Sequence, residues 1–483
     1  MAMMGFIRNF RPLEILGEEQ VELIARGTLQ VLEETGLRIE HERALKLLQS
    51  NGCSVDYDKM MVRIRPGLVG ECLSKCPSSF LVRARDPKHN LFFGGNVTYF
   101  KNSAGMRTID LDTWEPRVPT RKENEDAVRV LDSLENLHVL GPYTPYFGFE
   151  GVPPAMAIPE SCAAKMRDST KVQMEGCADE SELFQIQMAQ AVCAEIIHVI
   201  SSSPPLTWSR AAIDALFRTV EAGFPIHDVA GQVFGGTAPV TLAGALVTSN
   251  ACIMVPIVLA QIIRPGTRVL AAVFDFPLNM QSGSPAFGAI GSSLHLAAFH
   301  QMWRRYGLPT HSCTCGYVSS KHVDFQAGYE KAIQATVAGM SGANLIGLHG
   351  AVSAELTFHP VQAIMDDDVA GMVGRFLRGT LVNEETLALD VIHRVGPIPG
   401  HYMGEEHTRK WWMSEDFIPK VADRLGYPEW LATGKRTALE YARERMERIL
   451  ESHQPKPLTS GQEAEIKRIL EEARKYYKKQ GKL

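Results

Sequence analysis

The chain has 483 residues, more than one typical domain, with a formal net charge of −5 and scattered basic residues. This balance argues against a nucleic-acid-binding surface. Its nine cysteines show no framework spacing, which predicts reduced thiols in a cytoplasmic protein. The N-terminus lacks a secretory apolar segment, and the longest apolar run, around 251–263, is too short to span a membrane.

The first part of the chain, residues 1–121, predicts an α+β segment. Apolar residues at helical spacing favour helices over 16–36 and 41–50. Short β-rich runs bounded by turn residues favour strands over 62–64, 80–84 and 90–93.

Residues 122–365 alternate between apolar strands and helices, which is typical of βα units. The order predicts an α/β fold, a TIM (β/α)8-type barrel, although an eighth strand must come from around 94–105 or from after 351. An open doubly wound sheet is the alternative, but it would want a Gly-rich dinucleotide fingerprint, which is absent. The seven predicted strands are 138–141, 171–176, 205–208, 226–232, 269–276, 310–317 and 343–348.

The last part, residues 366–483, predicts a C-terminal helical cap and tail. Helices are expected over 366–377, 384–395 and 435–451, and an amphipathic helix over 462–477 follows a linker. The acidic run Asp366-Asp-Asp368 is interpreted as the start of a helix, where negative charge is favoured.

Aromatic side chains gather near the predicted strand ends, where barrel active sites lie. A quaternary ammonium has no N–H to donate, and ring faces bind it with about 0.5–2 kcal/mol for each contact. The pattern therefore indicates a cage for such a cation, although single members can equally be core residues. The candidates are Tyr99, Tyr146, Trp208, Phe276, Tyr317 and Phe358.

Two polar residues complete the candidate substrate site. His349 ends an apolar strand ahead of Gly350 and is expected to donate to a carboxylate. Gln232, before a Gly-rich turn, is expected to donate an amide hydrogen bond to substrate or cofactor.

A metal site is an alternative for one strand. His311, Cys313 and Cys315 alternate along the predicted strand 310–317 and would share one face. Neighbours on one face lie about 7 Å apart, too far for three ligands of one tetrahedral zinc ion. No metal is therefore assigned, and these residues stay an alternative set.

Three segments resemble the trimethylamine methyltransferase family, including its non-pyrrolysine members. They are Lys321-His-Val-Asp-Phe-Gln-Ala-Gly-Tyr-Glu330, Pro239-Val-Thr-Leu-Ala-Gly-Ala-Leu246 and Gly379-Thr-Leu-Val-Asn-Glu-Glu-Thr-Leu-Ala-Leu-Asp390. The likeness runs from about residue 16 to 451. It implies a TIM barrel that passes a methyl group from a methylated amine to the cobalt of a separate corrinoid protein.

The sequence contains no pyrrolysine, the residue that family members acting on trimethylamine carry. By resemblance, this departure favours the branch that acts on quaternary amines, with glycine betaine as substrate and dimethylglycine as product. Proline betaine and carnitine share the cationic head and stay open as substrates. The leaving tertiary amine needs no proton, so no general acid or base is assigned.

The corrinoid (cobalamin) is expected on a partner protein, and no tightly bound cofactor of the chain's own is expected. The nearest match to a corrinoid-binding Asp-x-His-x-x-Gly motif is Asp390-Val-Ile-His393-Arg-Val-Gly396, which has one residue too many. No nucleic acid or membrane partner is expected, and the length with the apolar terminal helices suggests a homo-oligomer. Two other functions stay open: a zinc-dependent corrinoid methyltransferase acting on thiols or methanol, and a non-catalytic quaternary-amine-binding protein.

Overall fold

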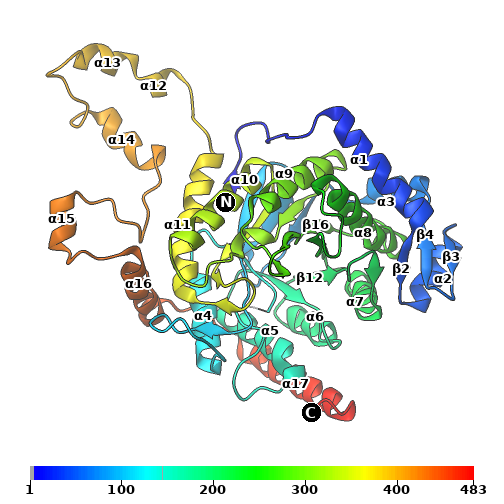
Figure 1. Cartoon of the computed structure of the whole chain (residues 1–483). Helices are drawn as coiled ribbons and strands as arrows, with labels where there is room; N and C mark the ends of the chain where they lie inside the picture. Colours follow the sequence, from blue (N-terminus) through cyan, green and yellow to red (C-terminus); the bar gives the residue numbers. More distant parts are fainter. Residues whose placement is uncertain (1–4, 144) are drawn as a thin grey trace.

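The computed structural model describes residues 5–143 and 145–483 (Figure 1). Parallel strands form a closed barrel, because β7 pairs with β10 on one side and with β20 on the other. The predicted TIM-type fold is therefore confirmed, and the eighth strand, whose place the prediction left open, is β7, in the first of the two expected regions. The barrel strands are β7 (Val97–Asn102), β10 (Val139–Leu140), β11 (Val172–Gly176), β12 (Ile196–Ser201), β14 (Ile226–Ala230), β16 (Val269–Val273), β19 (Thr310–Ser312) and β20 (Leu345–His349).

A helix follows each barrel strand and covers the outside of the barrel (Figure 1). The strands are buried on both faces and consequently read as continuous apolar runs. The helices are α4 (Arg121–Ser133), α5 (Ala157–Asp168), α6 (Glu182–Ala191), α7 (Arg210–Glu221), α8 (Leu242–Ile263), α9 (Ile290–Arg305), α10 (Phe325–Met340) and α11 (Pro360–Leu377).

The barrel runs from Val97 to Leu377. The strand β7 thus lies within the N-terminal segment that sequence reasoning placed at 1–121. The helix α11 likewise crosses the expected boundary at residue 366.

The N-terminal elements close the bottom of the barrel and cover one side. The hairpin β5–β6 packs against the inward side chains of the strands in one apolar cluster, which also contains Tyr99. A small sheet and two helices pack beside α8. These elements are β1 (Phe6–Ile7), α1 (Glu18–Gln30) with a π turn at Val31–Thr35, β2 (Leu37–Ile39), α2 (Glu42–Ser50), β3 (Ser54–Asp56), β4 (Met61–Arg63), α3 (Pro66–Lys75), β5 (Ser79–Val82) and β6 (Leu91–Gly94).

One predicted barrel strand is wrong. The segment 205–208 does not enter the barrel, because β13 (Thr207–Trp208) pairs with β2 in the small outer sheet. The barrel strand is β12, whose first residues fall in the helix that the sequence pattern predicts over 181–197. That helix ends at Ala191, and Cys193 takes a left-handed backbone conformation with φ of 59°, which separates helix from strand.

The helix α8 is longer than the apolar run that the sequence predicts. Its 22 residues are long and apolar enough to cross a membrane by length and composition. Of the most apolar window, however, 78% is buried, and the helix packs against α1, α3 and α7. These contacts are those of a core helix between the barrel and the N-terminal elements.

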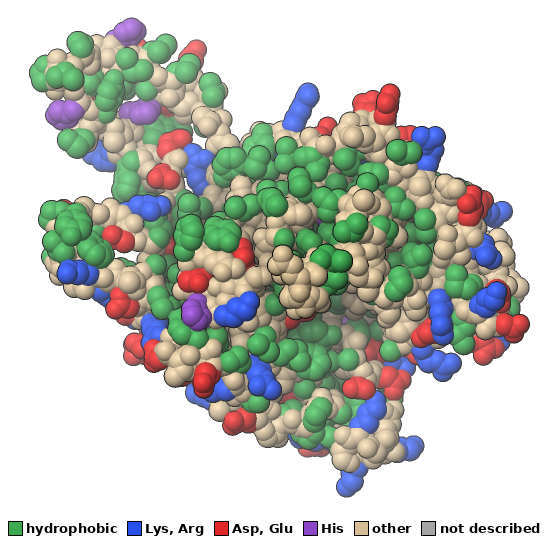
Figure 2. All heavy atoms as spheres, in the orientation of Figure 1, with side chains coloured by type: hydrophobic (Ala, Val, Ile, Leu, Met, Phe, Trp, Pro, Cys, Tyr) green, Lys and Arg blue, Asp and Glu red, His purple; other side chains and the backbone are tan. Residues whose placement is uncertain are grey.

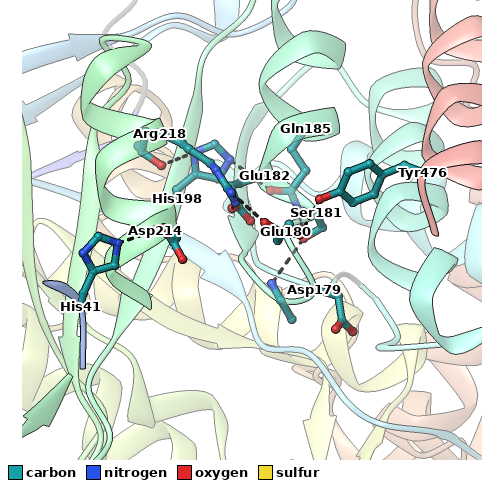
Figure 3. A network of polar contacts seen from close by, with 12 residues as sticks. His41, Asp179, Glu180, Ser181, Glu182, Gln185, His198, Asp214, Arg218 and Tyr476 are labelled. Atoms are coloured by element: carbon teal, nitrogen blue, oxygen red, sulfur yellow. Dashed lines mark hydrogen bonds and ion pairs between the residues drawn. The ribbon is translucent and has the colours of Figure 1, made fainter. Parts of the chain in front are cut away.

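The C-terminal helix α17 (Ser460–Lys479) packs on α5 and α6. Figure 3 shows Tyr476 pointing from this helix toward Glu180, with Arg218 of α7 bound to the same carboxylate. The Tyr476 hydroxyl donates to Glu180 over 2.5 Å, and the Arg218 guanidinium donates to it over 2.8 Å. The tail thus belongs to the barrel's outer layer.

Between α11 and α17 the chain leaves the body and returns. Helices α12 (Glu384–Leu387), α13 (Leu389–Val395), α14 (Glu406–Glu415) and α15 (Tyr427–Ala432) project away from the barrel (Figure 1). The helix α16 (Ala438–Ser452) packs back on α11 and α4.

The prediction that the acidic run Asp366–Asp368 starts a helix is wrong. The run lies in the middle of α11 and is buried. Each carboxylate has its own protein partner. Asp366 pairs with Lys331 at 2.6 Å, and Asp367 accepts from the Asn136 backbone at 3.0 Å. Asp368 accepts from the backbone N–H groups of residues 420–422. Buried charges are tolerated because they are paired in this way.

Short strands and turns form the loops above the barrel. They are β8 (Thr108–Ile109), β9 (Pro116–Arg117), β15 (Val233–Phe234), β17 (Phe276–Asn279), β18 (Ser284–Pro285), β21 (Ala351–Val352), β22 (Thr357–Phe358) and a 3-10 turn at Thr314–Gly316.

Candidate active site

A cavity of about 260 Å³ lies inside the barrel at the C-terminal ends of the strands. Inward side chains of β7, β12, β14 and β19 form its floor, and the loops that follow β7, β10, β16, β19 and β20 form its walls. The lining residues are Lys101, Ala104, Gly105, Met106, Pro142, Tyr143, Phe147, Met174, Val199, Ser201, His227, Val229, Phe274, His311, Cys313, Tyr317 and Glu355. This end of a parallel barrel carries the active site in enzymes of this fold.

A buried lysine stands at the floor of the cavity. Lys101 comes from β7, is 4% exposed, and donates from Nζ to the Asn102 carbonyl over 3.1 Å. Burial lowers the pKa of its ammonium to about 8, because the charged form loses its hydration. A side chain at Gly347 on the neighbouring strand would contact Nζ, so the glycine leaves room around the lysine.

Beside the lysine, two histidines and a cysteine form a compact buried group. His227 Nε2 and His311 Nδ1 are 2.7 Å apart, and the Cys313 sulfur lies 3.3 Å from His311 Nδ1. Burial lowers the pKa of His227 to about 3 and raises the pKa of the Cys313 thiol to about 12. At neutral pH the group is therefore a set of uncharged donors and acceptors.

The same three residues are a candidate metal site, because their ligand atoms all lie within 4.8 Å of one another. The Cys313 sulfur lies 3.3 Å from His311 Nδ1 and 3.6 Å from His227 Nε2. Both distances suit a sulfur and a nitrogen that bind the same zinc ion. The 2.7 Å between the nitrogens is a hydrogen-bond distance. Tetrahedral zinc would separate them by about 3.3 Å. The outer nitrogens, His227 Nδ1 and His311 Nε2, have no partner in the described chain to orient them as zinc ligands. The group fits mutual hydrogen bonding better than zinc.

Four aromatic rings wall the cavity above this floor. Tyr143 and Phe147 follow β10, with ring centres 4.9 Å apart. Phe274 follows β16, and its ring centre lies 5.2 Å from that of Tyr317 after β19. Burial raises the pKa of both tyrosine hydroxyls, so all four rings are neutral and offer π faces.

The Tyr143 ring depends on a glycine for its place. A methyl group on Gly176, the last residue of β11, would overlap the ring of Tyr143. Tyr143 itself has a left-handed backbone with φ of 55°. A strained residue held over a glycine at the mouth indicates that the ring position matters to the site.

An acidic residue lies at the rim. Glu355 follows β21, is exposed, and lines the cavity from the loop side. The protein around it raises the pKa of its carboxyl by partial desolvation. The site consequently has a cation at the floor, neutral rings in the middle and an acid at the rim.

Of the substrate residues expected from the sequence, Tyr317 lines the cavity. Tyr99 lies lower, in the core cluster at the bottom of the barrel, with its hydroxyl at 3.3 Å from the Phe92 backbone. Phe358 and Tyr146 are buried against each other outside the cavity, with ring centres 5.6 Å apart.

Four other expected residues do not line the cavity. Trp208 is buried in the outer sheet and donates to the Cys252 carbonyl over 3.2 Å. Gln232 accepts from the Thr248 hydroxyl at 2.7 Å, behind β14. His349 points toward Asp367 of α11, 3.5 Å away. Phe276 packs behind the wall residue Phe274, 4.7 Å from it.

The three residues of the alternative metal set, His311, Cys313 and Cys315, do not all lie together. His311 and Cys313 lie together at the cavity, but the strand ends at Ser312, and the chain turns before Cys315. The predicted strand over 310–317 is therefore too long, and Cys315 is buried in the main core instead. His227 takes the place beside the pair.

Sequence reasoning missed Lys101, His227, Tyr143, Phe147 and Phe274 as members of one site. Lys101 and His227 each stand inside an apolar strand, and a polar residue there is a signal of an inward position. The direction of each side chain depends on the barrel register, which the sequence did not give.

A closed parallel barrel with a polar floor and an aromatic mouth defines a barrel enzyme that encloses a small ligand. The model of the family "Trimethylamine methyltransferase (MTTB)" matches residues 1–476, so the chain belongs to this family and is a methyltransferase. Trimethylamine methyltransferase MttB of Desulfitobacterium hafniense is 30% identical, covering 95% of this chain and 94% of that protein. The glycine betaine methyltransferase of the same species is 30% identical, covering 94% and 96%.

A more distant relative is trimethylamine methyltransferase MttB of Methanosarcina barkeri, 28% identical over 96% of both chains. Among solved structures, the hydroxylamine complex of MtmB aligns with a TM-score of 0.48 and 10% identity, covering 95% of this chain and 92% of that chain. The barrel described above rests on the strand pairing of this chain and not on that alignment.

Proposed function

We propose that the protein transfers a methyl group from a quaternary amine, glycine betaine or a close relative, to the cob(I)alamin of a corrinoid protein and releases dimethylglycine. The observation that carries this proposal is the pairing of four neutral ring faces with one buried lysine in a single cavity. The 30% identity to a glycine betaine methyltransferase supports it.

In this proposal the two ends of the substrate take different parts of the cavity. The carboxylate binds at the floor, to the Lys101 ammonium, beside the neutral His227–His311 pair. The trimethylammonium group lies between the rings, each contributing about 0.5–2 kcal/mol. One methyl group then faces the mouth, where a partner protein presents the acceptor.

The transfer breaks one carbon–nitrogen bond and forms one bond from carbon to the acceptor. The electron pair of the broken bond stays on nitrogen, which becomes an uncharged tertiary amine and needs no proton. The work of the chain is accordingly to orient the methyl group and to exclude water. The neutral state of the His227, His311 and Cys313 group agrees with a step that uses no general acid.

The cavity volume favours the smaller betaines. Pockets for drug-sized ligands usually have about 300–1,000 Å³. The 260 Å³ found here suits glycine betaine better than carnitine, whose chain is longer.

The free state of all nine cysteines agrees with a cytoplasmic enzyme.

A calorimetric binding panel tests the two-ended site. Glycine betaine should bind more tightly than choline, which lacks the carboxylate, and than 3,3-dimethylbutanoate, its uncharged-head isostere. Trimethylamine, which is protonated at neutral pH, offers a cationic head but no carboxylate, and should bind more weakly than glycine betaine. Equal affinities for choline and glycine betaine would remove the role given to the floor.

A zinc-dependent methyltransferase is the second candidate, favoured by the grouping of His227, His311 and Cys313. About one zinc ion per chain, lost in Cys313→Ser, would establish it. Protein purified without chelator and holding no zinc would leave the quaternary-amine site as the explanation.

A further inference from the structure

The arm, defined as residues 378–420, has no core of its own. Every residue in it is described, and none is buried. Its helices α12, α13 and α14 have 4, 7 and 10 residues. Isolated helices shorter than about 12–15 residues are marginal in water, so an outside surface is needed to hold them.

The arm is rich in exposed apolar side chains, as the upper-left lobe of Figure 2 shows. Ile398 is 95% exposed and Met403 is 84% exposed. The complete set is Leu381, Val382, Leu387, Leu389, Ile392, Ile398, Tyr402, Met403, Trp412, Met413 and Ile418. So much exposed apolar surface on one segment marks an interaction site.

Some of the arm's charged residues are paired within the arm. Arg394 bonds Glu405, and Lys410 bonds Glu385. At its base, Phe417 packs on Gly371 of α11, and Asp368 holds the returning chain. The arm is thus anchored at its base and presents the exposed apolar side chains outward, beside charged residues such as Glu406 and Arg409.

The body carries an apolar face that the arm of the same chain leaves uncovered. Phe325, Tyr329 and Ile333 follow one another at helical spacing along α10, and Phe325 is 85% exposed. Met372 and Phe376 are also exposed, on the adjacent helix α11. In Figure 1 the arm projects away from these helices rather than across them.

We propose that the arm of one copy binds the α10–α11 face of a second copy, and that the second copy returns the same contact. A single chain supplies both surfaces, which is what an isologous two-fold interface requires. Stable protein–protein interfaces of standard size involve about 20–30 residues on each side. Permanent homo-oligomer interfaces are more apolar than transient ones. A corrinoid protein must bind and leave at each turnover, which fits a less apolar surface.

Light scattering after gel filtration of the full chain tests the proposal. The unaltered protein should be an oligomer at micromolar concentration. The double variant Ile398→Asp/Met403→Asp and the variant Phe325→Asp should each dissociate toward monomers. Both sites are exposed, so the circular dichroism spectrum should not change. Leu23→Asp on α1, at a residue 64% exposed, is the matched control and should stay oligomeric.

A mixture of the two dissociated variants gives the sharper result. The arm variant keeps an intact face and the face variant keeps an intact arm, so the mixture should form a heterodimer through one remaining contact. A monomeric unaltered protein, or an oligomer that both variants leave intact, would overturn the proposal. It is also overturned if the arm variant stays oligomeric and loses only methyl transfer to the corrinoid protein, because the arm would then serve that partner.

Discussion

At the residue scale, the site depends on a lysine that folding makes less basic. Lys101 sits at the floor of a cavity whose other groups are neutral, and its pKa falls to about 8. A bound carboxylate would restore the charged form by supplying an opposite charge. The floor therefore selects an anionic end group only while the lysine is protonated.

Replacing Lys101 with methionine should weaken glycine betaine binding about 10- to 100-fold, since hydrogen bonds to charged groups contribute about 1.5–3 kcal/mol. In the unaltered enzyme KM should rise above about pH 8, because the lysine is protonated below its pKa of about 8 and loses its charge above it. Initial rates across pH check both effects. Choline is the control, and its KM should respond to neither change. Equal losses for both substrates would show a general packing defect.

The glycine below the Tyr143 ring gives a second test. Gly176→Ala should raise KM for glycine betaine several-fold, because the added methyl group displaces one wall of the ring cage. Gly67→Ala on α3 has open space around it and should change nothing. Steady-state kinetics measure the effect, and unchanged KM in Gly176→Ala would show that Tyr143 does not contact the substrate.

At the element scale, local patterns predicted most helices but not the full set of barrel strands. The amphipathic helices 41–50 and 462–477 were found within about two residues, because their apolar periodicity is local. The strand Ile196–Ser201 was merged with the preceding helix, since an apolar run does not by itself distinguish a buried strand from a buried helix.

The site was harder to predict than the fold, for a geometric reason. Tyr317, which follows a strand end, lines the cavity, whereas Tyr99 lies inside β7 and Phe358 inside β22, and both are core residues. Which way each side chain points depends on strand register and on where the strand stops. The turn after Ser312, which separates Cys315 from Cys313, has no clear signal in the sequence.

The helix α17 offers a test of an element rather than of the site. Ile469 is fully buried against α5 and α6. Ile469→Ala should destabilise the protein by about 2–5 kcal/mol, the usual cost of such a cavity. Urea unfolding should show a lower midpoint, whereas Lys467→Ala on the exposed face should keep the midpoint within error. A small effect of Ile469→Ala would mean that the tail is not part of the cooperative unit.

At the scale of the whole molecule, the parts define one direction of transfer. The barrel closes at the bottom with the β5–β6 hairpin, and the cavity opens at the strand ends. A substrate bound with its carboxylate on Lys101 has its methyl groups at the opening. No residue of the arm, which the structure describes in full, lines the cavity, so its opening is available to the partner protein proposed to bring the acceptor.

The most direct measurement of this account is methyl transfer by the purified protein to cob(I)alamin, followed by the absorbance of methylcobalamin, with dimethylglycine measured in parallel. The account predicts equal amounts of both products from glycine betaine, and much less methylcobalamin from trimethylamine. Methylcobalamin formed from trimethylamine but from no quaternary amine would contradict it.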